Sequence, residues 1–376
     1  MRLRSIDGGP SYFRQWTENA PPNDTGFFPI GVWQETGTNA QKLRARGINM
    51  IINPVNTPGI GVHNISALED EADMWAGAGT ADWTGKIPGE GNICSPDSSK
   101  CGFSVMLDHQ SEVAPGEMRY ANYGKGVVFW ESDADAARFV NDYQDVVSVD
   151  LYWATDPDLC QASQGGSLFG AAQPMPEAEC HKASNYGRAV DRVRDLVSPR
   201  NSKPVWAYVE LGQPTSNSPS PIPIPEIKAA VWSSIIHEAR GIVYFNHSFG
   251  GPCQSQHVLD DCDPNVAPAV TALNAQVTEF APTLNSATVD GFVSAKGADT
   301  LAKGSGGDIY IFAGSNKVES QYVTLHMACG LPNEVEVVDE DRNLPVGPDG
   351  TFSDRFDDSN AYHIYRVPAA AKGCGV

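Results

Sequence analysis

The chain has 376 residues, of which 41% are hydrophobic, and it carries a formal net charge of −20. A single core stops growing near about 250–300 residues, so we expect one large domain and a smaller one. The negative charge disfavours nucleic acid and anionic membranes as partners, because their phosphates would be repelled. Apolar runs stay short of the roughly 18–20 residues that a membrane span needs, so the sequence predicts a soluble globular protein.

From residue 27 onward, short strand-like runs alternate with amphipathic helical stretches, a pattern typical of β/α units around a parallel sheet. Two further runs, TADWTG and FSVMLDH, bring the strand count to eight, the number in a (β/α)8 TIM barrel. We therefore predict such a barrel over residues 1–284. The predicted strands are 27–33, 48–54, 80–85, 103–109, 116–124, 146–153, 204–211 and 242–249, and the helices are 40–47, 65–79, 133–144, 185–199, 226–241 and 264–284.

After residue 285 the pattern changes to apolar and polar alternation with Gly/Asp/Asn turns, as in DIYIFAGS, QYVTLHMA, NEVEVVDE and AYHIYRV. This period of two predicts a small antiparallel β-sandwich over residues 285–376. The fold class is thus α/β, a TIM barrel followed by a β-sandwich domain. Long loops rich in Pro, Gly and Ser on the barrel, at 86–102, 155–184, 212–225 and 250–264, suggest a shaped rim on its functional face.

The eight cysteines lie in neighbouring pairs along the sequence. None of these pairs has the CxxC or Cys/His spacing of a zinc site, so local disulfides are the simpler interpretation. Disulfides indicate an oxidising compartment, and we expect an extracellular protein. The segment MRLRSIDGGPSYFRQW lacks the apolar middle of a signal peptide, so the chain is either mature or delivered without a classical leader. The predicted pairs are Cys94–Cys101, Cys160–Cys180, Cys253–Cys262 and Cys329–Cys374.

Glu210 ends the apolar run in KPVWAYVELGQP. If one more barrel strand follows, this is the seventh, and its carboxyl end lies on the face where barrel enzymes place catalytic groups. Glycoside hydrolysis needs two carboxyl groups, while aromatic rings stack on sugars and amides bind their hydroxyls. Glu210 is therefore our candidate for one catalytic carboxyl. Other predicted strand ends supply the substrate-binding candidates Trp33, Glu35, Asn122, Asp150, Tyr152, Trp153 and His247.

Several stretches in order, among them FFPIGVW, YANYGKG, VVSVDLYW, KPVWAYVELG and IKAAVWSSIIHEARGIVYF, resemble the large clan of retaining (β/α)8 glycoside hydrolases that carry a C-terminal β-sandwich. In that clan the nucleophile ends the seventh strand and the acid/base ends the fourth, so the resemblance implies Glu210 as the nucleophile. The clan's Asn-Glu pair on the fourth strand is absent here. If FSVMLDHQSE is that strand, Glu112 or Asp108 supplies the acid. If TADWTGKIPGEG is that strand and 103–113 is a helix, Glu90 does.

We therefore expect an extracellular glycoside hydrolase acting on a poly- or oligosaccharide by a retaining two-carboxylate mechanism. It is expected to need no cofactor or metal and to be a monomer or weak oligomer. One alternative is a carbohydrate-binding protein on a barrel that has lost its acid/base. Another is a structural or surface-attachment protein, since a fold alone does not establish function. In those cases Glu210 caps a loop and His247 is a core histidine.

Overall fold

A parallel sheet forms the centre of the larger part of the molecule. The computed structural model describes all residues except 69–71, 73–98, 169–172, 330–331 and 369–376. The strand order is β4-β3-β2-β8-β7-β6-β5. A parallel bridge between Ala67, two residues after β4, and Tyr120 on β5 joins the two edges of the sheet, so the sheet closes into a barrel. Its strands are β2 (Ile30–Trp33), β3 (Met50–Ile52), β4 (His63–Ile65), β5 (Tyr120–Tyr123), β6 (Val146–Val149), β7 (Val205–Glu210) and β8 (Ile242–Phe245).

The ring differs from the predicted eight strands, because the described residues supply seven. The prediction of a strand at 103–109 is wrong, since these residues lie within helix α3 (Ser99–Glu112). Phe103 and Met106 are buried at helical spacing, and the Phe103 ring packs 4.6 Å from that of Phe139. The run TADWTG lies outside the described residues. Strand β4 was not predicted, because three residues are too few to show a period.

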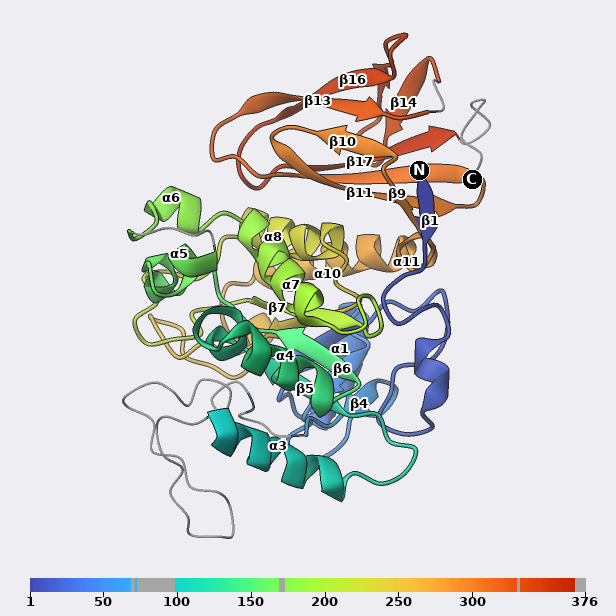
Figure 1. The fold of residues 1–376 in the computed structure, drawn as a ribbon. Helices are drawn as coiled ribbons and strands as arrows, with labels where there is room; N and C mark the ends of the chain where they lie inside the picture. The colour runs from blue at the N-terminus through green and yellow to red at the C-terminus, as the bar shows by residue number, and fades with distance from the viewer. Residues whose placement is uncertain (69–71, 73–98, 169–172, 330–331, 369–376) are drawn as a thin grey trace.

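Helices cover the outside of the barrel (Figure 1). Side chains along β7 alternate between the two faces of the sheet. Val205, Ala207 and Val209 pack against the helices on the outside. Trp206 and Tyr208 fill the barrel interior. None of the described helices is long and apolar enough to cross a membrane. The helices are α1 (Ala40–Ala45), α3, α4 (Asp133–Asp142), α5 (Gly165–Leu168), α6 (Glu177–Cys180), α7 (Ser184–Leu196), α8 (Ile224–Ile236), α9 (Val258–Asp261), α10 (Val266–Glu279) and α11 (Ala281–Leu284).

The C-terminal part consists of two antiparallel sheets that lie beside α8, α10 and α11 (Figure 1). Their orders are β1-β9-β11-β12-β17-β14-β15 and β10-β13-β16, and both contribute to one apolar core. The N-terminal strand β1 (Arg2–Arg4) pairs with β9, so the chain begins in the C-terminal sheet. The other strands are β9 (Thr288–Asp290), β10 (Val293–Ala295), β11 (Ala298–Ser305), β12 (Asp308–Ser315), β13 (Gln321–Met327), β14 (Glu334–Val337), β15 (Arg342–Pro345), β16 (Thr351–Phe356) and β17 (Tyr362–Pro368).

Candidate functional site

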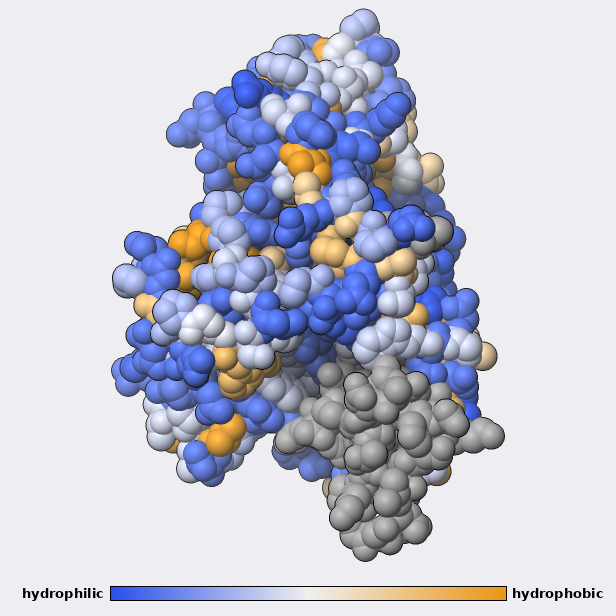
Figure 2. Space-filling view, turned by 90° about the vertical axis from the view of Figure 1, so that its left-hand side faces the viewer, coloured by the Kyte–Doolittle hydropathy of each residue, from blue (hydrophilic) through white to orange (hydrophobic). Residues whose placement is uncertain are grey.

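Because the barrel strands are parallel, their carboxyl ends meet at one face, which is where functional groups gather in such folds. The loop after β6 carries α5 and α6 on this side of the molecule. Figure 2 shows the same side, where apolar residues form separate patches among polar ones. We call this face the barrel mouth.

Glu210 is the last residue of β7 and is fully buried. Counted from β2, its strand is the sixth of the seven and the last but one. Its carboxyl group accepts a hydrogen bond from the Thr155 hydroxyl at 2.9 Å and another from the Tyr186 hydroxyl at 2.7 Å. Burial raises the pKa of Glu210 to about 7, although both hydroxyl groups favour its charged form. Glu210 is thus poised to carry a proton near neutral pH.

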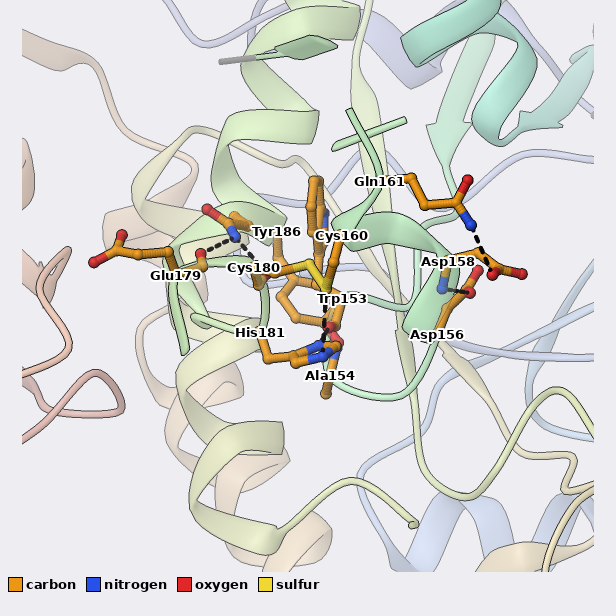
Figure 3. Close-up of a disulfide and its surroundings, with 11 residues drawn as sticks. Trp153, Ala154, Asp156, Asp158, Cys160, Gln161, Glu179, Cys180, His181 and Tyr186 are labelled. Carbon is orange, nitrogen blue, oxygen red and sulfur yellow. Dashed lines mark hydrogen bonds between the residues drawn. A yellow bond between two sulfur atoms is a disulfide. The ribbon is translucent and has the colours of Figure 1, made fainter. Parts of the chain in front are cut away.

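A disulfide bond braces the two segments that supply these hydroxyl groups. Cys160 and Cys180 are bonded, with their Cα atoms 5.4 Å apart, and the His181 ring is hydrogen-bonded to the Trp153 carbonyl (Figure 3). The Tyr186 hydroxyl also accepts a bond from the Ala154 amide at 3.1 Å. The loop after β6 and the start of α7 are therefore fixed together over Glu210. Sequence reasoning missed Thr155 and Tyr186, because neither lies in a recognisable motif.

Two of the four predicted disulfides, Cys160–Cys180 and Cys253–Cys262, are confirmed. Cys329 is also disulfide-bonded, and its predicted partner Cys374 lies outside the described residues, as does Cys94. The ligand atoms of Cys160, Cys180 and His181 lie within 4.8 Å of one another. The two sulfur atoms are bonded to each other, so they do not offer the thiolates that a metal site requires.

Asp150 directly follows β6, the neighbour of β7 in the barrel. Its carboxyl group accepts hydrogen bonds from Asn122 Nδ2 at 3.2 Å and from the Tyr152 hydroxyl at 3.0 Å. The Tyr152 ring lies 5.1 Å from that of Phe245 on β8. Unlike Glu210, Asp150 is only half-buried. The mouth therefore holds a second carboxyl group, on a residue less buried than Glu210, although the Asp150 Oδ1 atom is itself buried.

A buried chain of hydrogen bonds holds Asn122 beneath Asp150. The Ser148 hydroxyl donates to Asn122 Oδ1 at 2.6 Å and lies 2.6 Å from the Tyr120 hydroxyl. Tyr120 in turn donates to the Tyr208 hydroxyl at 3.1 Å. Tyr208 and Glu210 lie on the same strand, so this chain fixes Asp150 relative to β7.

A second polar group on the mouth is centred on Glu35, which is 1% exposed. Its carboxyl group accepts a bond from Asn246 Nδ2 at 3.1 Å and lies 2.9 Å from His257 Nδ1. His247 is 3% exposed, and burial lowers its pKa, so the ring is neutral near pH 7. Its Nε2 has no hydrogen-bond partner among the described residues. Sequence reasoning missed His257, whose only signal was its place on a predicted rim loop.

The predicted sugar-stacking tryptophans are packed inside the protein. Trp153 is fully buried, and a Cβ added at Gly165 would lie 2.7 Å from its ring. Trp33 is 8% exposed and packs 6.0 Å from the Tyr208 ring. These positions do not support stacking on a ligand. Phe249, which was not predicted, offers an open aromatic ring at 47% exposed, and Trp130 after β5 is 41% exposed.

The structure does not bring the predicted acids Asp108 and Glu112 to the mouth. Both are exposed on α3 rather than placed at a strand end. Gln110, which lies between them on α3, donates to the carbonyls of Asp142 and Tyr143 at the end of α4, a few residues before β6. That contact lies at the amino end of the strands, on the side opposite Glu210. Glu90, the third acid candidate, lies outside the described residues.

A cavity of about 430 Å³ lies away from the mouth, between the ends of α7 and α8 and strands β9 to β11. Arg4, Arg194 and Glu238 line it, and both arginines are within 2.8 Å of the Glu238 carboxyl. These ion pairs tie the end of α8 to the N-terminal segment and to α7.

The fold is that of TIM-barrel glycoside hydrolases. A glycoside hydrolase family 5 protein from Bacteroides vulgatus is 13% identical, with a TM-score of 0.51 over 95% of this chain and 91% of that chain. A maltogenic alpha-amylase from Thermotoga neapolitana is 8% identical, with a TM-score of 0.51 over 92% of this chain and 99% of that chain. No family model and no curated protein matches the sequence. At these identities the likeness concerns the fold alone.

Proposed function

We propose that this chain is an extracellular glycoside hydrolase that cleaves a poly- or oligosaccharide at the barrel mouth. The observation that carries the proposal is the pair of carboxyl groups, Asp150 and Glu210, which end neighbouring strands in different surroundings. The similar folds named as a glycoside hydrolase and an amylase support it, and the disulfides support the location. We further propose that residues 1–284, apart from strand β1, form the catalytic barrel, and that residues 285–376 form a β-sandwich domain that β1 joins.

The two carboxyl groups suit different steps. Glu210, with a pKa raised by burial to about 7, holds a proton that it donates to the glycosidic oxygen. Asp150 attacks the anomeric carbon as the leaving group departs. Glu210 then takes a proton from water, which displaces Asp150 and gives net retention of configuration. This assigns Glu210 the acid/base role instead of the nucleophile role that the resemblance implied. To reach the substrate, Glu210 must exchange its bond with Thr155.

The rest of the mouth suits a sugar. Phe245 and Phe249 have ring centroids 6.3 Å apart and offer an apolar surface for pyranose rings. The His247 ring packs behind them, with its centroid 5.1 Å from that of Phe245, and at 3% exposed it supports the Phe245 ring rather than contacting a ligand. The two phenylalanines would hold the substrate by its ring faces.

A panel of polysaccharides and aryl glycosides tests this proposal on the wild-type protein and on Glu210→Gln. We expect hydrolysis of at least one substrate, with the first-formed sugar retaining its anomeric configuration by proton NMR. Glu210→Gln should lose about 10²–10⁴-fold in rate on natural substrates. It should lose less on aryl glycosides whose leaving groups need no proton. Binding without hydrolysis by the wild type would instead indicate a carbohydrate-binding protein.

A further inference from the structure

His257 is a residue of the barrel mouth to which the proposed reaction assigns no role. It lies on the loop after β8, directly before α9, and its Nδ1 atom is 2.9 Å from the carboxyl group of Glu35, two residues after β2. The Glu35 side chain is 1% exposed, whereas that of His257 is 36% exposed. The pair therefore joins a buried carboxyl group to a ring that reaches the surface.

The hydrogen bonds of the Glu35 carboxyl group to the described residues come from donors. Oε1 accepts from the Thr36 amide at 2.7 Å and from Asn39 Nδ2 at 3.1 Å. Oε2 accepts from Asn246 Nδ2 at 3.1 Å and lies 3.0 Å from His257 Nδ1. Because a carboxylate only accepts, Nδ1 of His257 must carry the hydrogen of this bond. In the neutral ring the other nitrogen, Nε2, is then an acceptor.

The Nε2 atom of His257 is placed to meet a ligand. One ring carbon separates it from Nδ1, so its lone pair points away from Glu35. No hydrogen bond joins it to any described residue, and it is not among the buried atoms, in contrast to Nε2 of His247. An acceptor that is open to solvent and fixed in direction by a buried carboxylate suits the recognition of a hydroxyl group.

The loop after β8 carries both His257 and the exposed ring of Phe249. The backbones of Ser248 and Ser255 pair in both directions, at 2.7 and 3.0 Å, and the Cys253–Cys262 disulfide braces the same loop. Phe249 lies inside this pairing, and His257 lies two residues beyond it. A ring for stacking and a nitrogen for hydrogen bonding are thus held on one braced loop.

This loop lies next to a proposed catalytic carboxyl group. Strand β8 pairs with β7 on one side, where Phe245 lies opposite Glu210. On its other side β8 pairs with β2, the strand that leads to Glu35. The loop after β8 therefore begins between the two glutamates.

We infer that His257 is a specificity-determining residue whose Nε2 accepts a hydrogen bond from a hydroxyl group of a bound neutral oligosaccharide. Glu35 is the positioning residue that sets the ring. A sugar isomer that directs this hydroxyl elsewhere leaves Nε2 without its partner and binds less well. The inference rests on the proposed function for the class of ligand, but it does not require that the ligand be cleaved.

Two substitutions of His257 separate a role in binding from a role in structure. The amide nitrogen in His257→Asn can take the place of Nδ1, so this variant keeps a donor for Glu35 and removes Nε2. His257→Gln places its amide near Nε2 and removes the donor to Glu35. The probes are maltotriose, cellotriose, xylotriose and mannotriose, titrated by calorimetry into the full chain carrying Asp150→Asn.

We expect His257→Asn to weaken binding of the best of these trisaccharides by about 3–10-fold, as for the loss of one hydrogen bond. Its melting temperature should stay nearly unchanged. His257→Gln should melt at a lower temperature and bind more tightly than His257→Asn. The matched control is His326→Asn, at an exposed histidine on β13, which should change neither quantity.

Unchanged affinity in His257→Asn would overturn the inference, because the ring would then only tie the loop to Glu35. Absence of binding by every trisaccharide in the Asp150→Asn parent would overturn it as well. A ¹⁵N spectrum of the neutral His257 ring should show the hydrogen on Nδ1, and a hydrogen on Nε2 would contradict the pairing with Glu35. If His257→Asn weakens binding but the wild type hydrolyses no glycoside, the inference stands and the proposed function fails.

Discussion

Two glutamates that are largely shielded from solvent have pKa values shifted in opposite directions. Glu210, at the mouth, has hydroxyl groups and a second carboxyl group for neighbours, and burial raises its pKa to about 7. Burial also tends to raise the pKa of Glu238, which lies beside the C-terminal sheet. The nearby cations Arg194, Lys303 and Arg4 outweigh burial and lower this pKa to about 2. The comparison shows that burial alone does not decide whether a glutamate is charged. The deciding factor is whether a cation lies beside its carboxyl group. A carboxyl group buried without one is suited to moving protons rather than to holding the structure together.

The largest expected effect comes from removing the cation at Glu238. Arg194 lies 2.6 Å from Asp7 and 2.8 Å from Glu238, and all three side chains are at most 10% exposed. Arg194→Ala leaves the two carboxylates buried with less compensation and should cost about 3–5 kcal/mol of unfolding free energy. Urea denaturation measures this cost. Arg200→Ala, which removes an exposed ion pair with Asp195, should cost less than about 1 kcal/mol.

The two glutamates should also give opposite pH dependences of stability. The raised pKa of Glu210 contributes stability that is complete below its ordinary value of 4.5 and is lost as the pH rises towards 7. The lowered pKa of Glu238 contributes stability above pH 4.5 that is lost as the pH falls towards 2. In thermal melts, Glu210→Gln should remove on the order of 1–3 kcal/mol of pH dependence between pH 4.5 and 7. An unchanged slope in that window would contradict a raised pKa for Glu210.

A smaller effect is expected from the hydroxyl group of Tyr186. Tyr186→Phe removes the donor to Glu210 and the acceptor of the Ala154 amide, so unfolding should become easier by about 1–2 kcal/mol. The pKa of Glu210 should rise further, because this bond favours the charged form. Urea denaturation measures the change in unfolding free energy, and a carbon NMR pH titration of the glutamate carboxyl groups measures the pKa of Glu210. Tyr322→Phe, at a tyrosine that is 76% exposed, should change neither.

The smallest effect concerns ligand affinity rather than stability. Phe249 is 47% exposed, so Phe249→Ala should leave the melting temperature nearly unchanged. If its ring stacks on sugar, the affinity for a bound oligosaccharide should fall about 3–10-fold, as for the loss of one aromatic contact. Calorimetry on the Asp150→Asn background measures binding without turnover. An equal loss in Tyr322→Ala, whose exposed ring lies in the C-terminal sheets, would exclude a specific role for Phe249.

The sequence predicts elements with a clear period and a long run better than it predicts contacts between distant segments. The alternation in DIYIFAGS indicated β12 at Asp308–Ser315, and the apolar run of VWAYVE indicated β7 with Glu210 at its end. The run FSVMLDH misled, because Phe103 and Val105 fit a period of two while Phe103 and Met106 fit a helix. The residues on either side of this run decide between strand and helix, because they continue the helix over Ser99–Glu112.

The candidate site was predictable only in part, for the same reason. Strand ends place Asp150 and Glu210 at one face, because carboxyl ends of parallel strands meet there. The partners that set the charge of Glu210 come from Thr155, Tyr186 and Glu226, which are far apart in the sequence and carry no shared motif. The sequence also does not show which side chains are buried. Trp153 was therefore expected to contact a ligand, although it lies in the core.

The central claim is that the carboxyl groups at the barrel mouth cleave glycosidic bonds. Its most direct test is kcat/KM of Asp150→Asn on the best substrate of the panel, compared with Glu112→Gln, which changes an exposed carboxyl group on α3. We predict a loss of about 10³-fold or more for Asp150→Asn with an unchanged melting temperature, and full activity for Glu112→Gln. Full activity in Asp150→Asn, or its loss in Glu112→Gln, would contradict the assignment of the site to the mouth.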